Sequence, residues 1–346
     1  RLTMNSSPRK VLTAKDVAEL SGVSRTTVFA VMAGKVGVTE KTREKVFAVL
    51  RAHGYQSGAI QKTLVAEFSK MIEVVIGNVN NPFYTEVITG INSVLAPHGF
   101  HHILHHGTDN DPHEGITSFE SMRAYDLRGY IIAAGEIERY EQHIRNVVKS
   151  GRPLVTIMPA PGTETHVVTF DNRACSRDVV AYLIGRGHRN ITYLAGPARS
   201  AISKERVIGL IEGLVAHDVE FRDSMTVRAG DTSADGYAAA IKILRKKESR
   251  PTAIVCCNDL VAIGVYKAAY ELGVRIPDDL SVVGFDGIEM GEVLGPPLTT
   301  LSIFPKKIGA KAAQLLVEAI SGQHTRGFRE VVMKHALVER ASVRSL

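Results

Sequence analysis

The chain has 346 residues, of which 45% are hydrophobic and 23% charged, and these proportions are typical of a globular protein with two or three domains. It contains no run of about 18 apolar residues and no apolar N-terminal segment, so neither a membrane-spanning helix nor a secretory signal is expected. Cys175, Cys256 and Cys257 do not form an even, spaced set, which argues against a disulfide scaffold and favours the reducing cytoplasm.

Positive charge is concentrated at the N-terminal end. Residues 1–69 contain eleven Lys and Arg and five Asp and Glu, and this difference equals the formal net charge of +6 of the whole chain. Residues 70–346 are therefore electrically balanced. A basic patch on a small N-terminal unit predicts attraction to the phosphates of nucleic acid, although a solvated basic surface without a partner remains the alternative on charge alone.

The basic N-terminal region predicts three short helices, a loop and a fourth short helix. The first helix starts at Thr13, which can cap it, and its apolar stripe includes Leu20. A turn with a glycine ends it, and Ser24 can cap the second helix, residues 25–32. Two helices joined by such a tight turn form a helix-turn-helix, and the second helix of that motif enters the major groove of DNA.

From Met71 onward, buried strands alternate with helices in two successive runs, which predicts two doubly wound parallel sheets. Residues 299–304, a helix at 308–320 and a last strand at 331–338 are expected to complete the two units by crossing between them. The other expected strands are residues 71–78, 100–107, 129–134, 154–158, 191–195, 225–228, 253–257 and 280–285. The other expected helices are residues 84–98, 112–124, 137–149, 172–185, 203–217, 235–245 and 260–272.

A histidine-rich segment, residues 100–107, invites a metal-site interpretation. His101 and His105, like His102 and His106, are four positions apart, a spacing that brings imidazoles together only on a helix. The flanking glycines favour a strand, so these side chains would alternate between two faces and no metal site is predicted. No nucleophile or cofactor-binding motif is visible either, so we expect no catalytic residue, no cofactor and no enzymatic activity.

Beside these patterns, the chain resembles the lactose repressor (LacI/GalR) family over nearly its whole length. In the N-terminal region the matching residues are Thr13, Lys15-Asp-Val-Ala18, Ser21-Gly-Val-Ser24, Thr27-Val28, Val31, Val38-Thr39, Thr42-Arg43, Val46, Gly54-Tyr55, Ala59-Ile60 and Leu64. In the remainder they are Asn81-Pro-Phe83, Asp171-Asn172, Gly187-His188, Gly196-Pro197, Arg206, Gly209, Asn258-Asp259, Ala262 and Gly284-Phe-Asp286. A helix-turn-helix match alone is weak, but this series with its spacing intact is specific.

The resemblance implies an α/β core of two doubly wound parallel-sheet lobes, similar to type I periplasmic binding proteins, with an all-α helix-turn-helix headpiece. The expected division is residues 1–56 for the headpiece, 57–69 for a hinge helix and linker, 70–168 plus 302–329 for the N-terminal lobe, and 169–301 plus 330–346 for the C-terminal lobe.

In function, the resemblance implies a cytoplasmic, homodimeric transcriptional regulator, in the first place a repressor. Its affinity for double-stranded operator DNA would be controlled by a small molecule bound between the lobes. A sugar, polyol or sugar acid is the expected effector, and a purine corepressor is the alternative. A free-standing solute-binding protein would share the core, but it would carry an export signal and no basic headpiece.

The same resemblance assigns the contacts to individual residues. Those expected to bind DNA are Thr13, Ser24, Arg25, Thr26, Thr27, Lys35, Thr39, Lys62 and Leu64. Those expected to bind the effector are Phe83, Arg206, Asn258 and Asp286. Arg206 offers forked donors to hydroxyls or a carboxylate, and Asp286 accepts from hydroxyls.

Alternatives remain open for several of these assignments. Arg206 could instead form a salt bridge between the lobes, and Asp286 could serve only to form a turn. Leu64 could be a buried linker residue rather than a wedge between base pairs. Phe29 and Ala30 depart from the family pattern, which leaves the operator sequence undetermined.

Overall fold

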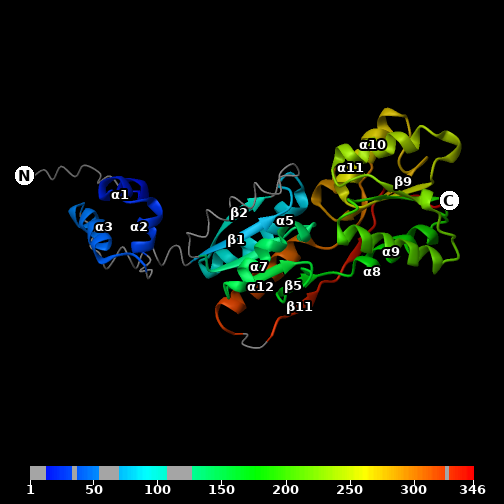
Figure 1. Ribbon diagram of the computed structural model, residues 1–346. Helices are drawn as coiled ribbons and strands as arrows, with labels where there is room; N and C mark the ends of the chain where they lie inside the picture. Colours follow the sequence, from blue (N-terminus) through cyan, green and yellow to red (C-terminus); the bar gives the residue numbers. More distant parts are fainter. Residues whose placement is uncertain (1–12, 33–36, 54–69, 107–126, 324–326) are drawn as a thin grey trace, which may run out of the picture. The chain divides into compact units, whose positions relative to one another are not determined.

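The computed structural model describes residues 13–32, 37–53, 70–106, 127–323 and 327–346 (Figure 1). The chain divides into two compact units, one of residues 1–72 with 116–128 and one of residues 73–115 with 129–346. None of the helices within the described ranges has the length and apolar character needed to cross a bilayer.

The described part of the N-terminal unit consists of α1 (Ala14–Ser21), α2 (Arg25–Met32) and α3 (Glu40–Ala52). Thr13 caps α1 in a reciprocal capping box with Asp16, as the spacing predicts. Gly22 ends α1 with a φ of 66°, a conformation that side chains with a Cβ rarely adopt. The three helices pack around one small core, whose buried members are Val17, Ala18, Val28, Val31, Met32, Val46 and Leu50.

Leu20 does not belong to this core. The apolar stripe predicts that it points inward, but its side chain is 54% exposed, and Ser21 takes the buried position. The Ser21 hydroxyl donates to the carbonyl oxygen of Val17 at 2.5 Å, so this polar side chain is satisfied within its own helix. The prediction is wrong because neighbouring positions on a helix are rotated by roughly 100°, which moves Leu20 off the buried face.

The described residues form a first sheet of six strands in the order β11-β5-β4-β3-β1-β2. Its strands are β1 (Met71–Ile76), β2 (His101–His106), β3 (Gly129–Ala133), β4 (Leu154–Ile157), β5 (His166–Thr169) and β11 (Glu330–Val332). The pairs β3–β4, β4–β5 and β5–β11 are parallel. The helices of this lobe within the described residues are α5 (Pro82–Leu95), α7 (Glu141–Lys149) and α12 (Pro305–Ile320), with short 3-10 turns η1 (Ala96–His98) and η2 (Ile137–Tyr140).

Close packing of α5 on α12 depends on glycine. A Cβ on Gly90 of α5 would lie 2.0 Å from the carbonyl oxygen of Lys306, and a Cβ on Gly309 of α12 would lie 2.0 Å from that of Val87. Larger side chains would therefore separate the two helices. This contact ties the late segment of the chain to the first lobe.

The second sheet also has six strands, in the order β12-β10-β9-β8-β6-β7. They are β6 (Ile191–Ala195), β7 (Thr226–Arg228), β8 (Ala253–Cys256), β9 (Ser281–Asp286), β10 (Thr299–Ser302) and β12 (Ala336–Val338). Its neighbouring strands are parallel except β10 and β12, which are antiparallel. Figure 1 shows α8 (Asn172–Gly185) and α9 (Ala201–Val215) on one side of this sheet, and α10 (Ser233–Leu244) and α11 (Asp259–Glu271) on the other. Short 3-10 turns are η3 (Asp223–Met225), η4 (Lys247–Ser249) and η5 (Glu289–Glu292).

The last predicted strand, residues 331–338, is in fact two strands in different sheets. β11 pairs with β5 of the first sheet, and β12 pairs antiparallel with β10 of the second. Residues 330–332 therefore belong to the first sheet, which corrects the expected assignment of 330–346 as a whole to the C-terminal lobe. The Met333 N–H donates to the carbonyl oxygen of Thr169 at 2.6 Å, which extends the contact with β5 to the point where the chain crosses over.

Several helices begin two residues earlier than predicted. The caps Asn81, Ser200 and Thr232 accept hydrogen bonds from the first turns of α5, α9 and α10. A capping side chain fixes a helix start before the first apolar residue, which is the position that the periodicity detects. The predicted helix at 112–124 and the predicted hinge helix lie outside the described residues.

Candidate DNA-binding headpiece and effector cleft

The start of α2 presents polar side chains to solvent. Arg25 and Thr26 are exposed, whereas Val28 is fully buried in the headpiece core. The Thr27 N–H donates to the hydroxyl oxygen of Ser24 at 3.0 Å, so Ser24 caps the helix as predicted. The first turn of α2, where the helix dipole is positive, is thus accessible to a DNA groove with Arg25 and Thr26 on it.

Two pairs of hydroxyls lie at the starts of α2 and α3. Ser24 pairs with Thr27 and Thr39 pairs with Thr42, each through one hydrogen bond of 2.8 Å between the side-chain oxygens. Each pair has two hydroxyl protons and uses one of them, so the second remains available to a phosphate oxygen. These two helix starts therefore suit phosphate contacts.

Thr13 differs from the other capping residues. Its hydroxyl and its N–H both donate to the Asp16 carboxylate, at 2.6 and 2.7 Å. No proton of Thr13 is left for a phosphate while this capping box is intact. The remaining residues predicted to bind DNA, Lys35, Lys62 and Leu64, lie outside the described residues.

A cavity of about 400 Å³ lies beyond the carboxyl ends of strands from both sheets. The residues predicted to contact an effector all line this cavity: Phe83, Arg206, Asn258 and Asp286. Phe83 comes from the first lobe and packs edge to face against Tyr84, with ring centroids 5.2 Å apart. The other three come from the second lobe, so the structure brings together residues separated by up to about 200 positions in the sequence.

Arg206 is held in place by groups of its own lobe. Its side chain on α9 is only 7% exposed, with Nε donating to the amide oxygen of Asn172 at 2.9 Å and Nη1 donating to the carbonyl oxygen of Cys257. The guanidinium carbon lies 3.3 Å from the centroid of the Phe285 ring. Among the described residues no ion pair joins Arg206 to the first lobe, so the alternative of an interlobe salt bridge is not supported.

Asp286 supplies a buried acceptor. It ends β9 with a φ of 115°, a left-handed conformation that favours glycine. Burial raises the pKa of its carboxyl well above the ordinary value, and the charge of Arg206 acts in the opposite direction. Asp286 forms a turn with Gly287 and also lines the cavity, so its contact with an effector stays a prediction.

Asn258 is mainly a structural member of the cavity wall. Its side-chain oxygen caps α11 by accepting from the Val261 N–H at 2.7 Å, and its amide nitrogen donates to the carbonyl oxygen of Asp231 at 2.8 Å. Asp171 caps α8 in the same way, accepting from the Ala174 N–H at 2.8 Å. Asn258 retains one proton and one lone pair for a ligand.

Comparison with known proteins identifies the family. Residues 13–57 match the family model for bacterial regulatory proteins of the lacI family, and residues 180–343 match the periplasmic binding protein-like domain. The HTH-type transcriptional repressor PurR of Mannheimia succiniciproducens is 30% identical over 96% of this chain and 99% of its own length. The chain belongs to the LacI family. A further relative, the ribose operon repressor of Haemophilus influenzae, is 29% identical over 96% of this chain and 99% of its own length.

Solved structures of LacI-family regulators share the fold. A complex of the regulator CelR with cellobiose has a TM-score of 0.70 at 26% identity, covering 96% of this chain and 100% of that one. A regulator from Enterococcus faecalis with bound ribose has a TM-score of 0.71 at 26% identity, covering 80% and 100%. The lac repressor dimer bound to operator and an anti-inducer has a TM-score of 0.71 at 25% identity, covering 97% and 100%. The predicted fold class is confirmed.

One contact across the cleft of this LacI-family core was not predicted. Glu136 follows β3 in the first lobe, and Arg199 precedes α9 in the second. Nε of Arg199 lies 2.9 Å from both carboxylate oxygens of Glu136, and both residues line the cavity. Neither belongs to a recognisable motif, so only the fold reveals that they meet.

The histidine-rich segment forms β2, a strand at the edge of the first sheet, as predicted. Nδ1 of His105 lies 2.5 Å from Oε1 of Glu73 on β1, and Nε2 of His143 on α7 lies 3.4 Å from Oε2 of the same carboxylate. Within the described ranges, no group of three or more His, Cys, Asp and Glu side chains is placed to hold a metal ion. His105 thus contacts the buried carboxylate of Glu73.

Proposed function

We propose that this LacI-family protein is a cytoplasmic, non-enzymatic repressor whose hold on operator DNA changes when a small metabolite occupies the cleft. The observation that carries the proposal is that Phe83, Arg206, Asn258 and Asp286 line one cavity in a chain with a helix-turn-helix headpiece. Two of its relatives in the family are named as repressors, and each aligns with 96% of this chain. We also propose that residues 57–69 link the headpiece to the two lobes.

The cleft suits a hydroxyl-rich ligand. Arg206 presents a fixed fork of donors and Asp286 a buried acceptor, while the aromatic rings of Phe83 and Phe170 offer apolar surface to the C–H face of a sugar ring. Two of the similar structures hold ribose or cellobiose. A sugar, polyol or sugar acid is therefore the proposed effector. A purine, the alternative that the family resemblance implies, is tested beside these compounds.

At the DNA, Arg25 and Thr26 would contact base edges in the major groove. The paired hydroxyls of Ser24 and Thr39 would donate to phosphates. Lys62 and Leu64, by family resemblance, would engage the minor groove through the hinge, where a leucine wedge kinks the duplex.

The proposal is tested with DNA from upstream of the protein's own gene and with a ligand panel. The full chain should retard an upstream fragment at low salt, and a chain lacking residues 1–69 should not. Thermal shift with D-ribose, cellobiose, polyols, sugar acids and purines should identify a stabilising compound that also changes operator affinity. Equal retardation by the truncated chain would contradict the DNA-binding role, and stabilisation by purines alone would contradict the effector class.

We further propose that a second copy of the chain covers an apolar surface at the end of α11. The Tyr266 hydroxyl donates to the carbonyl oxygen of Pro296 at 2.9 Å, which places this face of α11 beside the segment after η5. Tyr270 lies one turn further along α11 and is 88% exposed, and Val293 in that segment is 82% exposed. Two-fold operators require paired headpieces, and a similar structure is described as a dimer.

If this surface is the dimer interface, a carboxylate placed on it should prevent dimer formation. Val293→Asp should shift the protein from dimer to monomer in sedimentation velocity, because a carboxylate would be buried without a partner in a symmetric interface. Val215→Asp is the matched control, since Val215 on α9 is also exposed. A Val293→Asp variant that stays dimeric, or a Val215→Asp variant that dissociates, would contradict the assignment.

A further inference from the structure

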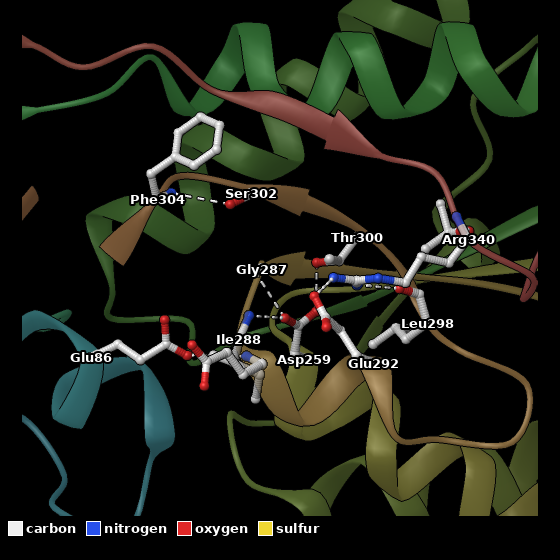
Figure 2. A network of polar contacts seen from close by, with 12 residues as sticks. Glu86, Asp259, Gly287, Ile288, Glu292, Leu298, Thr300, Ser302, Phe304 and Arg340 are labelled. Atoms are coloured by element: carbon white, nitrogen blue, oxygen red, sulfur yellow. Dashed lines mark hydrogen bonds and ion pairs between the residues drawn. The ribbon is translucent and has the colours of Figure 1, made fainter. Parts of the chain in front are cut away.

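Asp259 is a fully buried acid that does not line the cleft. It is the first residue of α11, and its side chain is 0% exposed. Oδ2 accepts from the N–H groups of Gly287 and Ile288, both at 2.9 Å, and Oδ1 accepts from the hydroxyl of Thr300 at 2.7 Å. Figure 2 shows these donors converging on the carboxylate from the turn after β9 and from β10.

The turn that Asp259 holds is conformationally costly. Asp286, directly before it, has a φ of 115°, and an L-residue keeps such a conformation only when its surroundings enforce it. The two N–H groups bound by Asp259 are those of the residues that follow Asp286. A Cβ on Gly284 would lie 2.0 Å from Oδ1 of Asp259, so the carboxylate sits directly against the backbone of β9.

We propose that Asp259 is a positioning residue of the effector site, which holds the turn at 286–288 so that the Asp286 carboxylate faces the cavity. The proposal rests on the effector role proposed for Asp286. Asp259 itself touches no ligand, because it is absent from the cavity wall that Asp286 and Asn258 form.

The ionisation of Asp259 supports a functional rather than a stabilising role. Burial raises its pKa to about 6, although hydrogen bonds from Thr300, Ile288 and Gly287 act in the opposite direction. Above that pH the folded protein therefore holds a charge at a cost in stability, which is a common property of residues kept for function. The charged and titratable groups that influence it or are influenced by it are Arg340, Asp286, Tyr266 and Cys256.

Two substitutions of Asp259 distinguish the effect of its hydrogen-bond acceptor from the effect of its negative charge. Asp259→Ala leaves the N–H groups of Gly287 and Ile288 buried without an acceptor. Asp259→Asn can place its amide oxygen where Oδ2 lies, while its NH2 group donates to the Thr300 hydroxyl oxygen. The asparagine variant should therefore retain the turn and rescue the effector site.

The experiment uses the full chain and two readouts. Amide hydrogen exchange of a peptide covering residues 284–290 reports the turn without any ligand, and calorimetric titration with D-ribose reports the effector site. In Asp259→Ala we expect exchange in this peptide, and the dissociation constant for D-ribose, to rise by about tenfold or more, with α8 unchanged. Asp259→Asn should stay within about twofold of the wild type in both readouts. Unchanged exchange in Asp259→Ala would overturn the proposal, whether or not D-ribose binds.

Asp286→Ala distinguishes this proposal from the function on which it rests. If Asp286→Ala binds D-ribose as the wild type does, the effector assignment fails while the exchange readout still tests the turn. If Asp286→Ala loses D-ribose and Asp259→Ala does not, the positioning role fails alone. Should Asp259→Ala not fold, Asp259→Asn decides, because it keeps the acceptor and removes the charge: exchange of residues 284–290 relative to α8 and the dissociation constant for D-ribose should both stay near the wild-type values. Loss of D-ribose binding in Asp259→Asn with unchanged exchange of the turn would overturn the proposal.

Discussion

At the scale of single residues, Glu73 is an acid within an otherwise apolar strand. Its side chain is 1% exposed, between the fully buried Ile72 and Val74. Burial raises the pKa of Glu73, but hydrogen bonds and charges from His105 and His143 outweigh burial and leave the pKa below its ordinary value. The carboxylate thus joins β1 to the edge strand β2 and to α7.

This arrangement predicts a pH-dependent contribution to stability. Glu73→Gln should lower the free energy of unfolding by about 3 kcal/mol at neutral pH, because it removes one partner of a buried ionic group. Since the folded pKa lies below the unfolded value of 4.5, the contribution is present above that value and is lost as pH falls through the folded pKa. Urea unfolding of the full chain should therefore distinguish the variant at neutral pH and progressively less below 4.5.

The control for this prediction is His101→Gln on β2, since His101 is exposed and should be replaceable without loss. Equal unfolding free energies for the wild type and Glu73→Gln at neutral pH would show that the ion pair contributes nothing to stability.

The position of a residue at the cleft could be predicted from the sequence where that residue belongs to a motif of the family. Arg206 and Asp286 were placed at the cleft because their types and spacing match the family, and both line the cavity. Asn172 as the partner of Arg206, and the Glu136–Arg199 pair, could not be predicted. Such partners are 30 or more positions apart in the sequence, and only the packed fold determines that they meet.

At the scale of elements, α2 has a polar start and an apolar end. Arg25 and Thr26 are exposed, whereas Phe29 and Ala30 are half-buried. Base recognition by this helix would therefore rest on its first turn. Phosphate contacts would come from the helix starts whose hydroxyl pairs keep a spare proton.

These differences predict distinct effects of two substitutions in the headpiece. Arg25→Ala should weaken operator binding by about 1–3 kcal/mol, because it removes a base or phosphate contact. Thr13→Ala should lower headpiece stability by about 1 kcal/mol through the lost cap. It should leave the salt dependence of binding unchanged, because both donors of Thr13 are occupied by Asp16. Fluorescence anisotropy at several salt concentrations measures both effects, and a reduced salt slope in Thr13→Ala would contradict the second.

Elements were predictable where a hydrophobic period ran for ten or more residues, as in α8, which starts and ends where expected. The prediction of a single strand over residues 331–338 was wrong, because the apolar residues Val331, Val332, Leu337 and Val338 fit the pattern of one strand. The hydrophobic pattern of a strand does not show which sheet the strand joins, so the crossover between β11 and β12 could not be predicted from the sequence.

At the scale of the whole molecule, the turn that carries Asp286 also touches the first lobe. The N–H of Glu289 donates to Oε1 of Glu86 on α5 at 3.0 Å, and the Glu289 side chain pairs with Lys306 at the start of α12 (Figure 2 shows Glu86 beside this turn). A ligand that moves Asp286 would therefore act on a segment in contact with α5. This contact is a candidate route by which occupancy of the cleft changes the arrangement of the lobes.

Glu86→Ala should therefore weaken the coupling between effector and operator more than it weakens operator binding itself. We expect the effector-induced change in operator affinity to fall by about threefold or more, while operator affinity without effector stays within about twofold. Glu86→Gln keeps an acceptor oxygen for the Glu289 N–H and is the matched control. Anisotropy titrations with and without D-ribose provide the measurement, and identical responses in all three proteins would exclude this route.

The central claim is that the cleft controls the headpiece, and one titration tests it directly. Operator affinity is measured for the wild type, Arg206→Ala and the exposed control Arg245→Ala over increasing concentrations of D-ribose. We predict that all three bind the effector-free operator equally, that the wild type and Arg245→Ala respond to the sugar by about fivefold or more, and that Arg206→Ala does not respond. Superimposable titration curves for the wild type and Arg206→Ala would contradict the account.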